Sequence, residues 1–171
     1  MSNKNYNKIS GFTLLELLVT IAVIVILATV GVPAFRTTIA NSRIESTSNA
    51  LRNSLVTARN KAIETASRVE VSPGNVGDWN SWKVGSGQLQ FALGATVVTG
   101  KTSGNSNIVD VTFTEDGSLG EETLEFQVFS VCYTGSVDSI KPKAVVISPG
   151  GLILIKDEVQ LVDLSISCPE S

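Results

Sequence analysis

A single carboxylate stands at the start of a long apolar run. Gly11-Phe12-Thr13-Leu14-Leu15-Glu16 opens the run, which continues to Phe35 without another acidic or basic residue. A carboxylate inside a lipid bilayer is unfavourable by about 3 kcal/mol on insertion scales unless it finds a partner. A cut between Gly11 and Phe12 would create such a partner, an α-amino group at Phe12. By position alone, the Glu16 side chain is expected to reach up to the headgroups. Pairing with such an amino group is the alternative, and the complete motif decides between the two.

The rest of the chain offers little for an enzyme. None of its 171 residues is histidine, which removes the commonest catalytic base and the commonest metal ligand. We find no nucleophile elbow and no phosphate-binding loop. The acidic residues Glu115, Asp116, Glu121 and Glu122 do not have the spacing of a calcium-binding loop. We therefore expect no catalytic activity, no cofactor and no metal site.

Two cysteines are the remaining reactive groups. Cys132 alternates in phase with Phe126 and Val128, and Cys168 alternates in phase with Leu164 and Ile166. Both thiols are therefore expected on the apolar faces of strands. In an oxidising compartment this arrangement predicts a Cys132–Cys168 disulfide, and two free buried thiols are the alternative.

The apolar run itself has the length of a membrane span. Residues 17–35 cover roughly 28 Å as a helix, close to the thickness of a hydrocarbon core. No small-residue cleavage site of a secretory signal follows it. Lys4 and Lys8 precede the span and Arg36 follows it, so the positive-inside rule places the N-terminus in the cytoplasm and residues 36–171 outside.

The opening motif resembles the cleavage site of type IV prepilins and type II secretion pseudopilins. The resemblance implies that a prepilin peptidase cuts after Gly11 and methylates the amino group of Phe12, so that 1–11 is a leader peptide. It also implies that Glu16 acts in assembly, by pairing with the amino group of a neighbouring subunit. Pro33 stands where the family has a helix proline, and a kink or local melting is expected over residues 29–33.

After the span, the pattern predicts one helix continuing to about Ala66 and then a β domain. An apolar stripe on the helix comprises Ile39, Ile44, Leu51, Leu55, Ala58 and Ala62. Pro73-Gly74 is expected to break the first strand, and residues 99–107 are expected to form a surface connection. Strands are expected near 69–72, 82–84, 89–91, 95–98, 108–113, 124–128, 144–148, 152–155 and 159–168.

The organisation that follows is a pilin-like α+β fold with four segments. They are the leader 1–11, the transmembrane and assembly helix 12–35, the amphipathic continuation 36–66, and a periplasmic β-rich domain 67–171, antiparallel because its strands are short and separated by glycine turns. The partners implied by the resemblance are other major and minor pilins, the prepilin peptidase and the inner membrane. The processed chain is then expected in a filament at the cell surface.

Several later pieces resemble the GspH/FimT group of minor pilins and pseudopilins. They are Ala58-Arg59 with Ala62-Ile63, the paired Trp79 and Trp82, Phe113-Thr114-Glu115-Asp116-Gly117, and Ala144 to Gly151. For the tryptophans we expect a role in core packing, and for Asp116-Gly117 a turn.

The group contains type IV pilus minor pilins, type II secretion pseudopilins and DNA-uptake minor pilins. The DNA-uptake members bind DNA through a late Gly-Arg-x-Arg motif, but this chain has Gly151-Leu152-Ile153-Leu154. Beyond residue 40, ten basic and fifteen acidic residues give a charge of −5, and Lys141, Lys143 and Lys156 are scattered. DNA is therefore disfavoured as a partner. The disulfide resembles pilus-type members more than secretion-type members, so we favour a minor pilin of a type IV pilus near the filament tip, with a type II secretion pseudopilin as the alternative.

Overall fold

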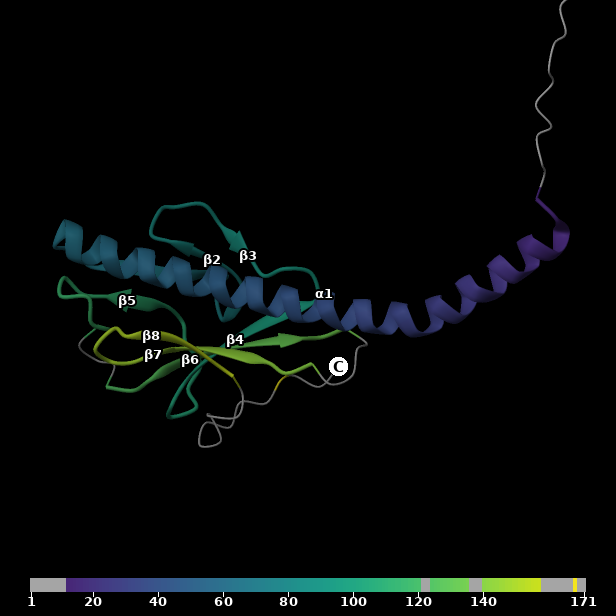
Figure 1. Cartoon of the computed structure of the whole chain (residues 1–171). Coiled ribbons are helices and arrows are strands. Elements are labelled where there is room, and N and C mark those ends of the chain that lie inside the picture. The colour runs from purple at the N-terminus through teal and green to yellow at the C-terminus, as the bar shows by residue number, and fades with distance from the viewer. Residues whose placement is uncertain (1–11, 121–123, 136–139, 158–167, 169–171) are drawn as a thin grey trace, which may run out of the picture. The chain divides into compact units, whose positions relative to one another are not determined.

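The computed structural model describes residues 12–120, 124–135, 140–157 and 168. It divides the chain into two compact units, residues 1–36 and residues 37–171. The first unit consists of the beginning of helix α1 (Leu14–Thr65). The second contains the remainder of α1 and all the strands (Figure 1).

Helix α1 ends where the sequence predicts. Ala66 has a φ of 45°, and the amide of Ser67 donates to the carbonyl of Ala62, five residues earlier, at 3.2 Å. This is the left-handed C-terminal turn that stops helices, here with alanine in place of the usual glycine. Nearer its N-terminus, α1 contains Pro33 and stays helical through it. The expected local melting over residues 29–33 is therefore not present.

Within the described residues, eight strands form two antiparallel sheets of four. The first sheet has the order β3-β2-β1-β5 and the second has the order β4-β6-β7-β8. Their bounds are β1 (Val69–Asn75), β2 (Asp78–Val84), β3 (Gln90–Phe91), β4 (Thr96–Thr102), β5 (Val111–Phe113), β6 (Gln127–Tyr133), β7 (Lys143–Ile147) and β8 (Ile153–Asp157). The expected long helix packed on antiparallel β-structure is therefore confirmed.

The core lies between the second part of α1 and the two sheets. From α1 it takes Ile44, Leu51, Leu55, Ala58 and Ala62, which confirms the predicted stripe except at Ile39, which remains 36% exposed. Both tryptophans are core residues, as expected. The indole of Trp79 donates to the carbonyl of Ile108 at 2.8 Å, and that of Trp82 donates to the Ser54 hydroxyl on α1 at 2.9 Å. Each polar indole nitrogen is thus satisfied inside the core.

Three expectations about strand boundaries are wrong. The strand expected near residues 124–128 instead runs over Gln127–Tyr133. Pro73 does not break β1. β5 pairs only with residues 69–71, so beyond them β1 has a described partner on one side alone. The amide that proline lacks would point to the unpaired side, so no hydrogen bond between strands is lost. Residues 99–102 are not a surface connection but the second half of β4. Gly100 pairs with Phe129 of β6 and leaves room for its ring, so packing overrides a loop-like composition. The predicted strand 159–168 lies outside the described residues except for Cys168.

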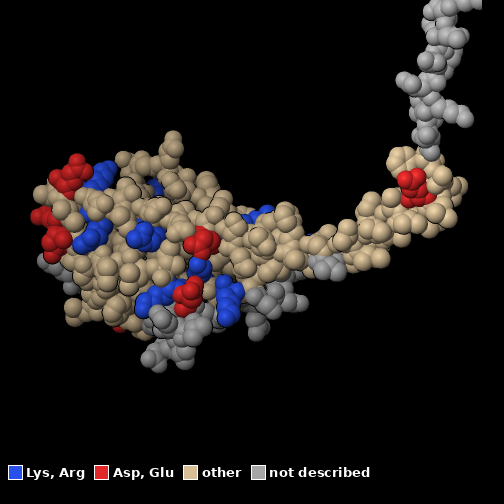
Figure 2. Space-filling model, viewed as in Figure 1, with Lys and Arg blue, Asp and Glu red and all other residues tan. Residues whose placement is uncertain are grey.

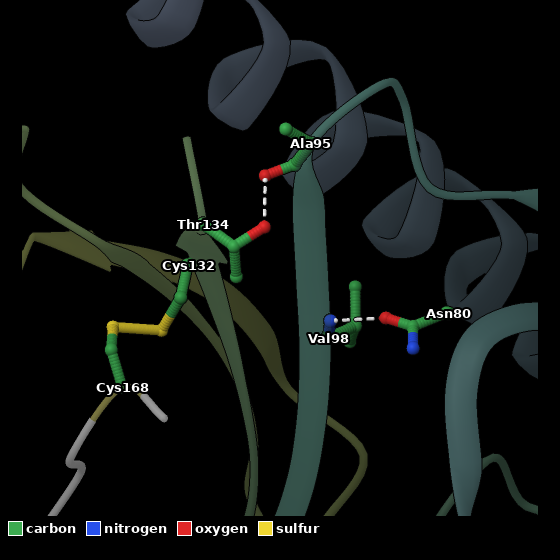
Figure 3. Close-up of a disulfide and its surroundings, with 6 residues drawn as sticks. All are labelled: Asn80, Ala95, Val98, Cys132, Thr134 and Cys168. Atoms are coloured by element: carbon green, nitrogen blue, oxygen red, sulfur yellow. Dashed lines mark hydrogen bonds between the residues drawn. A yellow bond between two sulfur atoms is a disulfide. The ribbon is translucent and has the colours of Figure 1, made fainter. Parts of the chain in front are cut away.

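A side-chain amide helps to join the sheets. The Asn80 side-chain oxygen on β2 accepts the backbone amide of Val98 on β4 at 2.9 Å, and the Asn80 carbonyl accepts the amide of Ala92 at 2.8 Å. On the other side of β4, the backbone and hydroxyl of Thr134 both donate to the carbonyl of Ala95 (Figure 3). Asn80 therefore extends the hydrogen bonding of β4 across the boundary between the two sheets.

Cys132 and Cys168 form the expected disulfide (Figure 3). Cys132 is buried in β6, and its Cα lies 5.8 Å from that of Cys168.

The bond closes a loop of 36 residues, so Cys168→Ser is expected to lower the free energy of unfolding by about 3 to 4 kcal/mol in the loop-entropy model. Urea unfolding of residues 37–171 measures the loss. Under reducing conditions, where the disulfide is open, Cys168→Ser should hardly change the free energy of unfolding. A loss there as large as under oxidising conditions would show that the effect comes from packing and not from the disulfide.

Candidate assembly site

The opening motif forms the first turn of α1. Thr13 precedes the helix, and its hydroxyl oxygen accepts the backbone amide of Glu16 at 3.2 Å. Thr13 and Glu16 thus occupy the first and fourth positions of a capping box, Thr-x-x-Glu, which was readable in the sequence and was missed there. Glu16 also lies in the first turn, where a carboxylate is favourable next to the positive end of the helix. Gly11 lies outside the described residues.

The side chain of Phe12 and the apolar side chains after it have no cover within the first unit. Phe12 is 80% exposed and Leu14 is 82% exposed. The other large exposed apolar residues of this unit are Leu15, Leu17, Leu18, Val19, Ile21, Val23, Ile24, Val25, Ile26, Leu27, Val32 and Phe35. In Figure 2, this stretch carries one acidic group near its start and is otherwise uncharged up to Phe35. By length and composition this is a helix that can cross a membrane.

The polar side chains within the apolar stretch are satisfied by the helix itself. The hydroxyl of Thr20 donates to the carbonyl of Leu17 at 2.8 Å, and that of Thr29 donates to the carbonyl of Ile26 at 2.7 Å. Neither hydroxyl therefore needs water, which suits a helix surrounded by lipid or by other helices. The arrangement can bury apolar surface and pair one charge.

Three of the later motifs meet at one point in the second unit. The Arg59 guanidinium on α1 donates through Nε to the carbonyl of Gly117 at 2.8 Å. Gly151 lies directly against that carbonyl, so close that a Cβ on Gly151 would be 1.9 Å from it. Both glycines have positive φ, 79° and 78°. Arg59 therefore ties α1 to the turn before β6 and to the turn between β7 and β8.

Asp116 shapes the first of those turns. Its carboxylate accepts the hydroxyls of Thr114 and Ser118 and the amide of Ser118, at 2.5, 2.7 and 3.1 Å. The hydroxyl of Thr114, followed by that of Ser118, lowers the pKa of Asp116 to about 2. The predicted turn is confirmed. Within the described ranges, no group of three or more acidic or cysteine side chains is placed to hold a metal ion.

Arg59→Met is expected to destabilise the second unit by about 1 to 3 kcal/mol, because the carbonyl of the buried Gly117 loses its charged donor. Urea unfolding of residues 37–171 measures the change. Lys61→Met is the control on the same helix, with an exposed side chain, and should change stability by less than about 0.5 kcal/mol. Equal effects of the two substitutions would contradict the role given to Arg59.

Among the residues weighed for DNA binding, two exposed positions are apolar and Lys143 is paired with carboxylates. Leu152 and Leu154 are 59% and 41% exposed, where the DNA-uptake members carry arginines. Lys143 forms an ion pair with Glu45 of α1 and lies 3.7 Å from Asp157 of β8. The hydrogen bond with Lys143 lowers the pKa of Glu45, and the same contact raises the pKa of Lys143. Lys143 is therefore already neutralised.

Comparison with known proteins gives two family matches. A model of the prokaryotic N-terminal methylation motif matches residues 6–32, and a model of the type II transport protein GspH matches residues 47–151, more than half of the chain. No curated protein matches at a significant level.

Two crystal structures of the type IV minor pilin FimU from Pseudomonas aeruginosa PAO1 share the fold. One aligns with a TM-score of 0.53 and 22% identity over 67% of this chain and 89% of that chain. The other, in a second crystal form, aligns with a TM-score of 0.50 and 22% identity over 66% of this chain and 91% of that chain. The pilin-like fold expected from the sequence is thereby confirmed.

Proposed function

This chain belongs to the GspH family of type II transport proteins, and from that membership we propose that it is a minor pilin of a type IV pilus with a structural role in priming assembly near the filament tip. The observation that carries the proposal is the helix start. A capped apolar helix with one carboxylate in its first turn lies inside a match to the N-terminal methylation motif and leads into a GspH domain. The fold shared with FimU, a type IV minor pilin, supports the pilus form of the proposal.

The proposal includes a sequence of events on the chain. Prepilin peptidase removes residues 1–11 and methylates Phe12. Residues 12–35 hold the subunit in the inner membrane, and residues 36–66 continue the helix into a periplasmic domain of residues 67–171. The exposed apolar side chains of the first unit support this, because the fourteen large ones among the described residues need lipid or neighbouring helices around them. Glu16 and Pro33 then act during incorporation among the helices of other pilins.

A minor pseudopilin of a type II secretion system is the second candidate. The description of the matching family favours it, since GspH is a type II transport protein. Both candidates use the same helix and the same fold. They differ in the assembly that incorporates the subunit, a type IV pilus or a type II secretion system.

Deletion of the gene separates the two candidates. We expect loss of twitching motility with normal secretion of an exoprotein, and restoration of twitching by the intact gene. Loss of secretion with normal twitching would establish the pseudopilin and contradict the pilus proposal.

A gel shift of residues 37–171 with duplex DNA at low and moderate salt tests the disfavoured DNA role, for which we expect no salt-sensitive binding in the micromolar range.

A further inference from the structure

The outer edge of the first sheet is formed by the two-residue strand β3. On one side β3 pairs with β2, with Phe91 opposite Ser81 and Gln90 opposite Trp82. On its other side no described strand pairs with it. The amide of Ala92 donates to the carbonyl of Asn80, so the alternation of an antiparallel ladder directs the backbone amide and carbonyl of Phe91 away from β2, toward the open edge.

Three large apolar side chains line this edge on its outer face. Leu89, Phe91 and Leu93 follow one another at every second position and are 41%, 63% and 47% exposed. Because Trp82 points into the core, Gln90 opposite it faces α1, and the three apolar side chains face the opposite way. An exposed row of this kind on an edge strand is a surface ready to pair with another chain.

The inner face of the same edge is hollow. A groove of about 510 Å³ lies between α1 and the segment that contains β3, and it is lined by Ala50, Asn53, Ser54, Thr57, Val84, Gly87, Gln88 and Gln90. None of these side chains is charged. The groove therefore suits small uncharged side chains. An extended segment added beside β3 would place alternate side chains in this groove and in line with the apolar row.

Cations stand at both ends of the row. Lys83 is exposed on β2, and the β2–β3 register continues to place it opposite Leu89. The Arg43 guanidinium packs against Gly94, next to Leu93. The amide of Leu93 donates to the Thr47 hydroxyl on α1, which ends the open edge there. A complementary segment is thus short and apolar at alternate positions, and it carries acidic residues at its ends.

We propose that the β3 edge docks an extended segment of a different subunit of the same filament, by strand addition. The inference rests on the proposed function, which supplies the neighbouring subunits. The proposed function and the β3 edge are connected through α1. The helix that begins with the uncovered apolar stretch also supplies four of the groove residues. The partner is recognised by its backbone hydrogen bonds, its alternating apolar side chains and its acidic flanks.

Photo-crosslinking of the full chain in its own cells tests the proposal. p-Benzoylphenylalanine replaces Leu89, at one end of the row, and sheared filaments are analysed for adducts by mass spectrometry. We expect one adduct, to another subunit that carries the N-terminal methylation motif, through a segment with the pattern described above. An adduct only to a second copy of this chain, or no adduct from chains that are present in filaments, would overturn the strand addition. Absence of the chain from filaments would instead reject the proposed function.

A matched pair of substitutions separates strand addition from simple apolar contact. Phe91→Pro and Phe91→Val both remove the ring, but only proline removes the outward amide, which β2 does not use. We expect roughly fivefold less adduct from Phe91→Pro than from Phe91→Val, as loss of one hydrogen bond predicts. Equal adduct yields would overturn the backbone pairing. Formation of the Cys132–Cys168 disulfide and an unchanged unfolding midpoint show that each variant is folded.

Discussion

Glu16→Gln is expected to leave cleavage and methylation intact and to reduce incorporation into filaments by roughly a hundredfold. The reason is the charge: an unpaired carboxylate in the bilayer is unfavourable by about 3 kcal/mol, and pairing it with a neighbouring amino group recovers that energy only on assembly. Glutamine keeps the size of the side chain and remains a good partner in the capping box, so it changes the charge and little else. Immunoblots of sheared filaments against total membrane protein measure the ratio.

Thr13→Ala is the control for helix capping. It removes the hydroxyl that accepts the Glu16 amide and leaves the carboxylate in place. A lost cap is worth about 1 kcal/mol, so the defect should be far smaller than that of Glu16→Gln. If Thr13→Ala were as defective as Glu16→Gln, the role of Glu16 would be to start the helix. Normal incorporation of Glu16→Gln would remove the electrostatic account altogether.

Gly11→Leu is expected to abolish processing and, with it, all incorporation into filaments. The family resemblance places the scissile bond after Gly11, and a branched side chain at that position obstructs the close approach of a peptidase to the backbone. Mass spectrometry of the purified chain should find Phe12, methylated, at the N-terminus of the unmodified protein. The variant should retain residues 1–11.

Ser10→Ala is the matched control, because it changes the neighbouring residue without adding bulk. It should be processed like the unmodified chain. An N-terminus other than methylated Phe12 in the unmodified protein would contradict the assignment of the site, whatever the variants do.

The helical part of the fold was predictable because its signals are local. The apolar run, the later stripe and the end near Ala66 follow from side-chain periodicity and length, and the structure confirms them, with Ile39 of the stripe as the exception. The cap by Thr13 was equally local and was overlooked. A kink or local melting was expected from the lost amide and the ring of Pro33 beside Gly31. Local melting does not occur, because a helix can absorb one lost hydrogen bond and remain continuous.

The β domain was less predictable because its boundaries depend on distant partners. Residues 99–102 are strand because β6 lies beside them, and Pro73 is tolerated because β5 stops short of it. The junction of Arg59, Gly117 and Gly151 joins segments far apart in the chain. Each residue belonged to a recognisable motif, but no spacing in the sequence indicates that the three motifs meet.

The continuity of α1 has a mechanical consequence. One helix runs from Leu14 to Thr65, and β1 begins only after it ends. Tension applied to the start of the chain therefore passes along α1 and enters the second unit as shear, through the contacts of Ile44, Leu51 and Leu55 with the core. The strands follow α1 in the chain, so this tension reaches them only after it has passed the contacts between the helix and the core. In the proposed filament, each subunit would therefore carry tension first through its helix.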